Sequence, residues 1–215
     1  MRVLITGGNS NLGRAIRSVF ASNGWECVVT SRAGDGDVHL DFEGTFDRDS
    51  FLSEVGEIDC LVNNAGVFTE GKQESLPEES FDKVFQVNMK GLFQVTQSLL
   101  PMLMQRNGTI VNVCSINAIH PGFGSTAHYD ATKGAVKAYT ASLAMETGLR
   151  VNAVAPGLLS ADRLKGSSLE SYWCAHSVFT EMVDPMNVAK AVYFLATSNG
   201  IYGQCIVVDN GYLLK

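Results

Sequence analysis

The sequence lacks three features that would place it in a specialised class of protein. It contains no basic run, and its formal net charge of −6 argues against general nucleic-acid binding. No apolar stretch approaches the roughly 18 residues that a membrane span needs. The apolar run at residues 3–5 is far too short for a signal peptide. We therefore expect no nucleic-acid partner, no membrane partner and a cytoplasmic location.

The sequence also lacks the cysteine spacing of a disulfide framework or a metal site. Five cysteines are scattered at positions 27, 60, 114, 174 and 205, with no pair at metal-ligand spacing. An odd and dispersed set predicts reduced thiols rather than disulfides or a metal site. The 215 residues fit one domain of the larger α/β kind, spanning 1–215, which buries enough surface to fold without a disulfide.

Short apolar runs alternate with helical patterns along the chain. The runs are continuously apolar, which is typical of strands buried on both faces of a parallel sheet. They cover residues 3–5, 27–30, 38–40, 60–62, 109–113, 151–154 and 205–208. This alternation predicts a three-layer, doubly wound (Rossmann) α/β fold with a mostly parallel seven-stranded sheet.

Apolar residues at helical spacing predict helices between these runs. We expect helices over 12–20, from about 78 to 103, from near 131 to 146, and over 188–196. A Ser75-x-x-Glu78 pattern, with Pro77 in the first turn, predicts a capping box at the start of the second helix.

One connection is too short for the fold. Only five residues, 33–37, separate the second and third apolar runs. A parallel crossover needs about a dozen residues, usually with a helix. We predict that the helix between the second and third strands is absent and that 38–40 is a short edge strand.

Two patterns indicate dinucleotide chemistry. Tyr129 and Lys133 are four residues apart, which places them on one helix face about 5–6 Å apart. Ser115 lies fourteen positions before the tyrosine, at the end of an apolar run. A glycine-rich turn, Thr6-Gly-Gly-Asn-Ser-Asn-Leu-Gly13, follows the first run, and such a turn binds pyrophosphate through backbone N–H groups and a helix N-terminus. Together they predict a nicotinamide-dependent carbonyl reductase or alcohol dehydrogenase.

Seven segments resemble, in order, the signatures of the short-chain dehydrogenase/reductase family. They are Thr6-Gly7-x-x-x-Asn11-Leu12-Gly13, Asn63-Asn64-Ala65-Gly66, Val87-Asn88-Met-Lys-Gly91, Ile110-Val-Asn-Val-Cys-Ser115, Tyr129-x-x-x-Lys133, Arg150-Val-Asn-Ala-Val-Ala-Pro-Gly157 and Gly203-Gln-x-Ile-Val-Val-Asp209. The resemblance implies these cofactor-binding residues: Gly7, Asn9, Asn11, Leu12, Gly13, Ser31, Arg32, Asp41, Phe42, Asn64, Ala65, Gly66, Tyr129, Lys133, Pro156, Gly157 and Leu159.

The chain departs from the family pattern at several points. Asn11 stands where the family has its middle glycine, and Ala161 stands where a threonine is usual, with Ser160 beside it. The absent helix after the second strand lies on the adenosine side of the cofactor. These departures concern cofactor binding, so the amide of Asn11 either crowds the pyrophosphate or hydrogen-bonds to it.

The resemblance also implies catalytic roles. Tyr129 is the general acid in reduction and the general base in oxidation. We expect the Lys133 ammonium to lower the pKa of this phenol and to bind the nicotinamide ribose. Ser115 orients the substrate oxygen, and Asn88 holds a water that links Lys133 to solvent. His120 and His128 are expected to be loop residues without an acid–base role.

The second strand bears on the choice of nicotinamide. NAD enzymes usually place an acid at its end, and NADP enzymes place an arginine nearby. Here Thr30-Ser31 is followed by Arg32, which favours NADP(H) over NAD(H), although Asp35 and Asp37 lie close. Asp41 resembles the family's adenine-contacting acid.

The loop after Ser115 and residues 158–180 are expected to enclose the substrate, a small carbonyl compound or alcohol. Their apolar side chains are typical of ligand pockets, and they are Ile116, Phe123, Leu159, Tyr172, Trp173 and Phe179. The resemblance implies a homodimer or homotetramer formed through the helices at 80–105 and 131–146. Two other functions stay open, a non-catalytic NADP(H)-binding redox sensor and a sugar-nucleotide epimerase or dehydratase.

Overall fold

The computed structural model describes every residue from 1 to 215 and contains one seven-stranded sheet in the order β3-β2-β1-β4-β5-β6-β7. All six strand pairings are parallel. The strands are β1 (Arg2–Ile5), β2 (Glu26–Ser31), β3 (Val38–His39), β4 (Cys60–Asn63), β5 (Thr109–Val113), β6 (Arg150–Pro156) and β7 (Cys205–Val208). The predicted doubly wound fold is therefore confirmed, and the sheet is entirely rather than mostly parallel.

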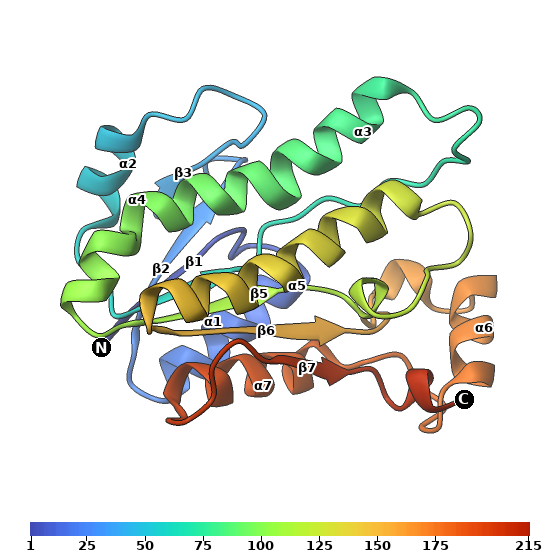
Figure 1. Cartoon of the computed structure of the whole chain (residues 1–215). Helices are drawn as coiled ribbons and strands as arrows, with labels where there is room; N and C mark the ends of the chain where they lie inside the picture. Colours follow the sequence, from blue (N-terminus) through green and yellow to red (C-terminus); the bar gives the residue numbers. More distant parts are fainter.

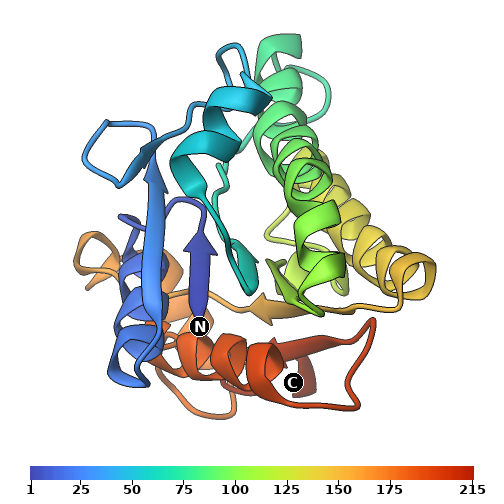
Figure 2. The ribbon, with the colours of Figure 1, turned by 90° about the vertical axis from the view of Figure 1, so that its left-hand side faces the viewer.

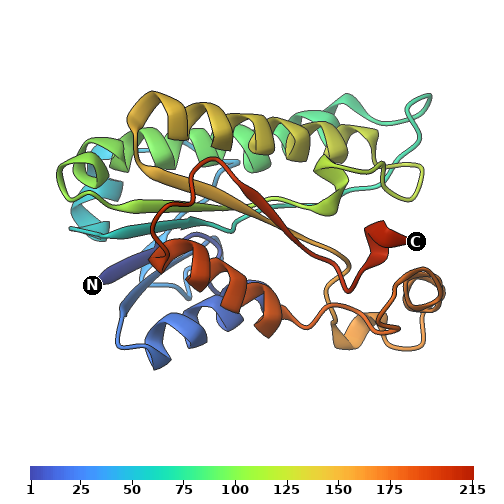
Figure 3. The same cartoon turned by 60° about the horizontal axis from the view of Figure 1, so that its bottom comes forward.

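Helices cover both faces of the sheet. They are α1 (Asn11–Ser22), α2 (Arg48–Val55), α3 (Glu78–Phe85), a π-helical turn (Gln86–Gly91), α4 (Leu92–Gln105), α5 (Ala127–Thr147), α6 (Ser168–His176) and α7 (Pro185–Thr197). Helices α1 and α7 lie on one face, and α2, α4 and α5 lie on the other (Figures 1 and 3). Figure 2 shows the same layers after a quarter turn, while α6 stands beyond the carboxyl ends of the strands.

Burial explains the continuous apolar runs. Every residue of β4 and β5 is buried, because helices cover them from both sides. The stripe predicted for the first helix faces the sheet, with Leu12, Ile16 and Phe20 buried. The sheet order reverses between β1 and β4, so the loops that follow these two strands meet at one point. In open parallel sheets, ligands bind at such a switch point.

The edge strand β3 has only two residues, and no helix lies between β2 and β3. Both predictions for this segment are confirmed. In place of a helix, Asp37 folds the connection back onto β2. Its backbone N–H donates to the Val29 carbonyl and its carboxylate accepts from the Val29 N–H, both at 2.9 Å.

Two local predictions about helices were wrong. The helix that carries Tyr129 begins at Ala127, one turn earlier than predicted. The capping box does not form, since Pro77 is the N-cap of α3 and makes no side-chain cap bond. Proline has the extended backbone of an N-cap, with a φ of −60° and a ψ of 139°, but no side-chain oxygen to accept a cap bond.

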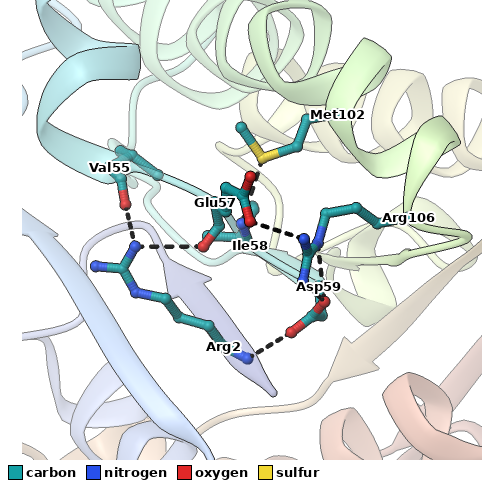
Figure 4. Close-up of polar contacts among 7 residues, drawn as sticks. All are labelled: Arg2, Val55, Glu57, Ile58, Asp59, Met102 and Arg106. Atoms are coloured by element: carbon teal, nitrogen blue, oxygen red, sulfur yellow. Dashed lines mark hydrogen bonds and ion pairs between the residues drawn. The ribbon is translucent and has the colours of Figure 1, made fainter.

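Polar side chains tie the amino ends of β1 and β4 together (Figure 4). The Asp59 carboxylate accepts from the Arg2 backbone N–H at 2.8 Å and from Arg106 Nη2 at 2.6 Å. Arg2 in turn donates to the Val55 carbonyl at 2.7 Å. This cluster lies at the end of the sheet opposite the switch point. None of the helices combines the length and apolarity that a bilayer crossing requires.

Candidate active site

The glycine turn between β1 and α1 leaves no room for side chains at its glycine positions. Gly7 has a φ of 61°, in the left-handed region that favours glycine. A Cβ on Gly13 would lie 2.4 Å from the backbone oxygen of Gly7, and one on Gly8 would lie 2.4 Å from the Cβ of Val29. The backbone at these glycines is therefore free of side chains, as the close approach of a pyrophosphate requires.

Helix α1 starts directly from this turn. The Ser10 hydroxyl caps it by accepting a hydrogen bond from the Gly13 N–H at 3.0 Å. The other N–H groups of the first helical turn have no intrahelical acceptor, and they carry the positive end of the helix dipole. This end of α1 thus favours an anion at the carboxyl edge of the sheet.

Side-chain hydrogen bonds lock the two loops of the switch point together. The Thr6 hydroxyl accepts from the backbone N–H groups of Asn64 and Ala65, both at 3.0 Å. The Asn64 amide donates back to the Thr6 carbonyl at 2.9 Å and to the Gly7 carbonyl at 3.0 Å. The Thr-Gly and Asn-Asn-Ala-Gly segments, far apart in the sequence, therefore form one rigid floor.

Two cavities, of about 410 Å³ and about 370 Å³, open on this floor and share lining residues, including Asn64 and Gly66. Residues predicted to bind the cofactor line the first cavity: Gly7, Asn9, Ser31, Arg32, Asp41, Phe42, Asn64, Ala65 and Gly66. The second cavity, called the catalytic cavity below, is lined by most of the other predicted site residues: Asn11, Leu12, Ser115, Tyr129, Lys133, Pro156, Gly157 and Leu159. Gly13 and Asn88 line neither cavity.

Tyr129 and Lys133 lie on one face of α5, as their spacing predicts. The Lys133 Nζ is 5.7 Å from the centroid of the Tyr129 ring and donates to the Val113 carbonyl at 3.1 Å. The ring of Phe68 packs edge-on against Tyr129, with centroids 4.9 Å apart. Ser115 follows β5 and caps the short helical turn after it, accepting from the Asn117 N–H at 3.2 Å. The structure thus brings three of the four predicted catalytic side chains to one cavity, while Asn88 does not line it.

Burial dominates the electrostatics of this cavity. It raises the pKa of Tyr129 to about 12, while the hydrogen bond with Ser115 acts in the opposite direction. Burial also lowers the pKa of Lys133. The predicted lowering of the tyrosine pKa by Lys133 was wrong, because burial outweighs the hydrogen bond and Lys133 is not among the groups that shift this pKa.

Asn88 lies in the π-helical turn that joins α3 to α4, and π-bulges are frequent at functional sites. Its side chain is buried and pairs twice with Val67, accepting from the N–H at 2.8 Å and donating to the carbonyl at 2.9 Å. It also donates to the Thr132 hydroxyl at 3.2 Å, one residue before Lys133. The asparagine therefore fixes the loop that forms the wall between the two cavities.

The adenosine side of the first cavity holds charges of both signs. Arg32 lines it with its side chain 63% exposed, and pairs with Glu43 at 2.9 Å. Asp35 also lines it, and hydrogen bonds from Ser31 and Asn9 hold the pKa of its carboxyl below the ordinary value. Asp37 does not line the cavity, because its carboxylate is used by the backbone of β2.

The predicted substrate wall was largely wrong. Of the six apolar residues, only Leu159 lines the catalytic cavity. Trp173 is fully buried, stacks on Tyr212 with centroids 4.3 Å apart, and packs against Gly157. The others lie in the core or on the surface outside the cavity, and they are Ile116, Phe123, Tyr172 and Phe179.

Other residues take part in the wall without having been predicted. Phe68 and Arg163 both line the catalytic cavity. Phe68 follows the Asn-Ala-Gly signature closely enough that its position is a usable signal, whereas nothing in the sequence singles out Arg163. His128 is not a loop residue as predicted, since it is buried in α5 and shares a 2.8 Å hydrogen bond with Thr69.

The described geometry defines a class. The sheet is parallel, and a glycine-rich turn lies at its switch point. The cavity at this turn is continuous with the catalytic cavity, and the two together fit a dinucleotide. The chain also matches, over residues 48–213, the family profile described as Enoyl-(Acyl carrier protein) reductase. A 3-oxoacyl-[acyl-carrier-protein] reductase from Thermotoga maritima is 34% identical, over 98% of this chain and 97% of the relative. A cyclopentanol dehydrogenase from Comamonas sp. is 31% identical, over 98% and 96%.

Solved structures agree with these relatives. ElxO with NADP bound superposes with a TM-score of 0.88 at 27% identity, covering 100% of this chain and 99% of that one. A 3-ketoacyl-(acyl-carrier-protein) reductase from Brucella melitensis complexed with NADH gives 0.87 at 28% identity, covering 98% and 97%. The chain therefore belongs to the short-chain dehydrogenase/reductase family of NAD(P)-binding oxidoreductases.

Proposed function

We propose that this chain is an NADP(H)-dependent oxidoreductase that reduces a carbonyl, or oxidises the matching alcohol, with Tyr129 as general acid and base. One observation carries the proposal. Ser115, Tyr129 and Lys133 line a single cavity that shares its wall with the cavity at the glycine turn. The nicotinamide supplies the hydride when bound.

The residues of the chain divide the remaining work. Tyr129, whose pKa is about 12, is protonated at neutral pH and donates its proton to the carbonyl oxygen. Ser115 orients that oxygen and stabilises the charge that develops on it. Lys133, whose Nζ lies 5.7 Å from the centroid of the Tyr129 ring, would bind the nicotinamide ribose. Asn88, fixed behind the wall, holds the water that reconnects Lys133 with solvent. Phe68 limits the access of water to the Tyr129 ring.

NADP(H) is the preferred nicotinamide in this proposal. Arg32 follows β2 and lines the first cavity, as expected of a residue that contacts a 2′-phosphate. Similar structures include one with NADP and one with NADH, so the preference rests on this arginine alone. Two relatives, a 3-oxoacyl-[acyl-carrier-protein] reductase and a cyclopentanol dehydrogenase, support a carbonyl compound or alcohol as substrate.

Residues 1–215 act in this proposal as one catalytic domain, assembled as a homodimer or homotetramer through α4 and α5. Exposed apolar side chains on these helices support the assembly, with Phe93 40% and Met145 90% exposed. Light scattering of the purified chain is the direct measurement. A monomer at all concentrations would refute it.

A redox sensor would bind NADP(H) without needing the Tyr129, Lys133 and Ser115 set. The test is a titration with NADPH and NADH followed by a panel of ketones and 3-oxoacyl thioesters, for the wild type and Tyr129→Phe. We expect Tyr129→Phe to lower the turnover number by a factor of about 10²–10⁴, while cofactor affinity changes only a few-fold. Tyr139→Phe, ten residues later on the same helix, is the control and should stay active. Full activity of Tyr129→Phe would refute the assignment.

A further inference from the structure

Glu43 joins two cations at the rim of the cofactor cavity. Its Oε1 lies 2.9 Å from Arg32 Nη1, and its Oε2 lies 3.0 Å from Lys83 Nζ. The three residues come from separate segments, since Arg32 follows β2, Glu43 follows β3 and Lys83 belongs to α3. The backbone N–H of Glu43 donates to the Asp41 carboxylate at 3.0 Å, which fixes the loop that carries it.

Glu43 stands between two cavities. It lines the cofactor cavity together with Arg32, and it lines a neighbouring groove together with Lys83. Residues 41–44 follow the edge strand β3 directly, which places Glu43 at the rim. Arg32, the cation that is expected to contact a 2′-phosphate, is thus already paired with the Glu43 carboxylate.

We propose that Glu43 is a specificity-determining residue that weakens NADPH binding by holding Arg32 and Lys83, and that these two cations together receive the 2′-phosphate. The proposal rests on the proposed function, since it concerns the same cofactor. A 2′-phosphate carries about −1.5 to −2 charges at neutral pH. It must therefore displace Glu43 or bind against its repulsion.

NADH meets a different situation at the same place. Its adenosine ribose carries a 2′-hydroxyl, which donates a hydrogen bond to a carboxylate and is not repelled by it. Asp35 and Asp41, the other acids that line this cavity, pair with neither cation, since Asp35 accepts from Ser31 on its own loop and Asp41 accepts from the backbone N–H of Glu43. Glu43 is therefore the acid whose removal separates the two cofactors.

The experiment is a calorimetric titration of the wild type, Glu43→Gln and Lys83→Gln with NADPH and with NADH. We expect Glu43→Gln to tighten NADPH binding about two- to fivefold, as for exposed ion pairs, and to leave NADH unchanged or weaker. Lys83→Gln should weaken NADPH by a similar factor without affecting NADH. Both effects should shrink in 0.5 M salt, where the Debye length falls to about 4 Å.

The matched control is Glu57→Gln. Glu57 pairs with Arg106 Nη1 at 2.9 Å, the same distance as in the Glu43–Arg32 pair, but at the opposite end of the sheet (Figure 4). It should change neither affinity. If Glu43→Gln moves both cofactors equally, or neither, the inference is wrong while the proposed function stands. If the wild type binds neither cofactor, the proposed function fails and the inference fails with it.

Discussion

The Asn11 side-chain amide donates a 2.9 Å hydrogen bond to the backbone carbonyl of Ser160, joining the glycine turn to the segment after β6. A glycine at this position, the family's usual residue, has no side chain to make this contact. Ser160 in turn donates its N–H to the Val183 carbonyl at 2.8 Å. The departure from the family pattern thus ties the wall of the catalytic cavity to the turn, and the amide is already engaged there rather than pointing into the turn.

Asn11→Ala should loosen this segment. A hydrogen bond of this kind contributes about 0.5–1.5 kcal/mol, so amide exchange over residues 158–162 should accelerate about two- to tenfold. Hydrogen–deuterium exchange is the measurement. The control is Asn23→Ala, which removes an amide-to-carbonyl bond of 2.8 Å to Val19 at the other end of α1. Equal exchange over 158–162 in Asn11→Ala and the wild type would show that the bond does not hold the segment.

The pKa of Tyr129 predicts opposite pH profiles for the two reaction directions. Reduction needs the protonated phenol, which persists up to a pKa of about 12. Titration of Tyr129 should therefore not lower the rate of reduction between pH 6 and 9. Oxidation needs the phenolate, so its rate should rise about tenfold per pH unit over the same range.

Ser115→Ala tests the cause of this profile. Burial raises the tyrosine pKa and the hydrogen bond with Ser115 lowers it, so removal of the hydroxyl should move the oxidation profile further to alkaline pH. Steady-state oxidation rates from pH 6 to 10 are the measurement. A wild-type oxidation rate that levels off below pH 8 would contradict a raised pKa and would restore the role first assigned to Lys133.

Much of the fold was predictable because its signals are local. Buried strands leave continuous apolar runs, and a five-residue connection excludes a helix between β2 and β3 by length alone. Helix α2 left no such signal, since only Phe51 and Val55 of its eight residues are buried. Helix α6 does carry a signal, the Ser167-x-x-Glu170 pattern, and Ser167 accepts from the Glu170 N–H at 3.1 Å, the first half of a capping box.

The candidate site was predictable where motifs follow strand ends. Parallel strands deliver their carboxyl ends to one edge, so Ser115 and Asn64 had to lie near the glycine turn. The direction of an aromatic side chain has no such rule, which is why Trp173 was wrongly assigned to the pocket. The Glu43–Lys83 pair forms between a loop and a helix that are distant in sequence, and the spacing of residues along the chain does not predict such a contact.

Gly157 should be intolerant of a side chain. A Cβ there would lie 2.4 Å from the buried Trp173 ring, which cannot move without disturbing its stacking on Tyr212. We expect Gly157→Ala to lower the free energy of unfolding by about 1–3 kcal/mol, as overpacking does.

The control is Gly134→Ala in α5, where nothing lies within 4 Å of the new methyl group. It should stabilise the chain by about 0.5–1 kcal/mol. Urea denaturation measures both, and equal stability of the two variants would refute the packing argument.

The cluster at the amino ends of β1 and β4 should make stability depend on acid pH. Burial of Asp59 opposes its ionisation, but the hydrogen bonds from Arg106 and from the Arg2 backbone outweigh this and hold its pKa below 3.8. Because the folded pKa is the lower one, the carboxylate stabilises the fold fully above about pH 4. This contribution is lost as the pH falls through the folded pKa. Asp59→Asn should therefore cost about 1–2 kcal/mol at pH 7, and the cost should shrink as the pH falls through the folded pKa and Asp59 of the wild type becomes protonated. The control is Asp162→Asn, whose partner Lys165 lies at 2.7 Å but whose side chain is 94% exposed, and it should have no measurable effect. Urea denaturation at pH 7, 5 and 2 separates the outcomes. A loss in Asp59→Asn that stays the same at all three values would mean that packing, and not the charge of Asp59, accounts for it.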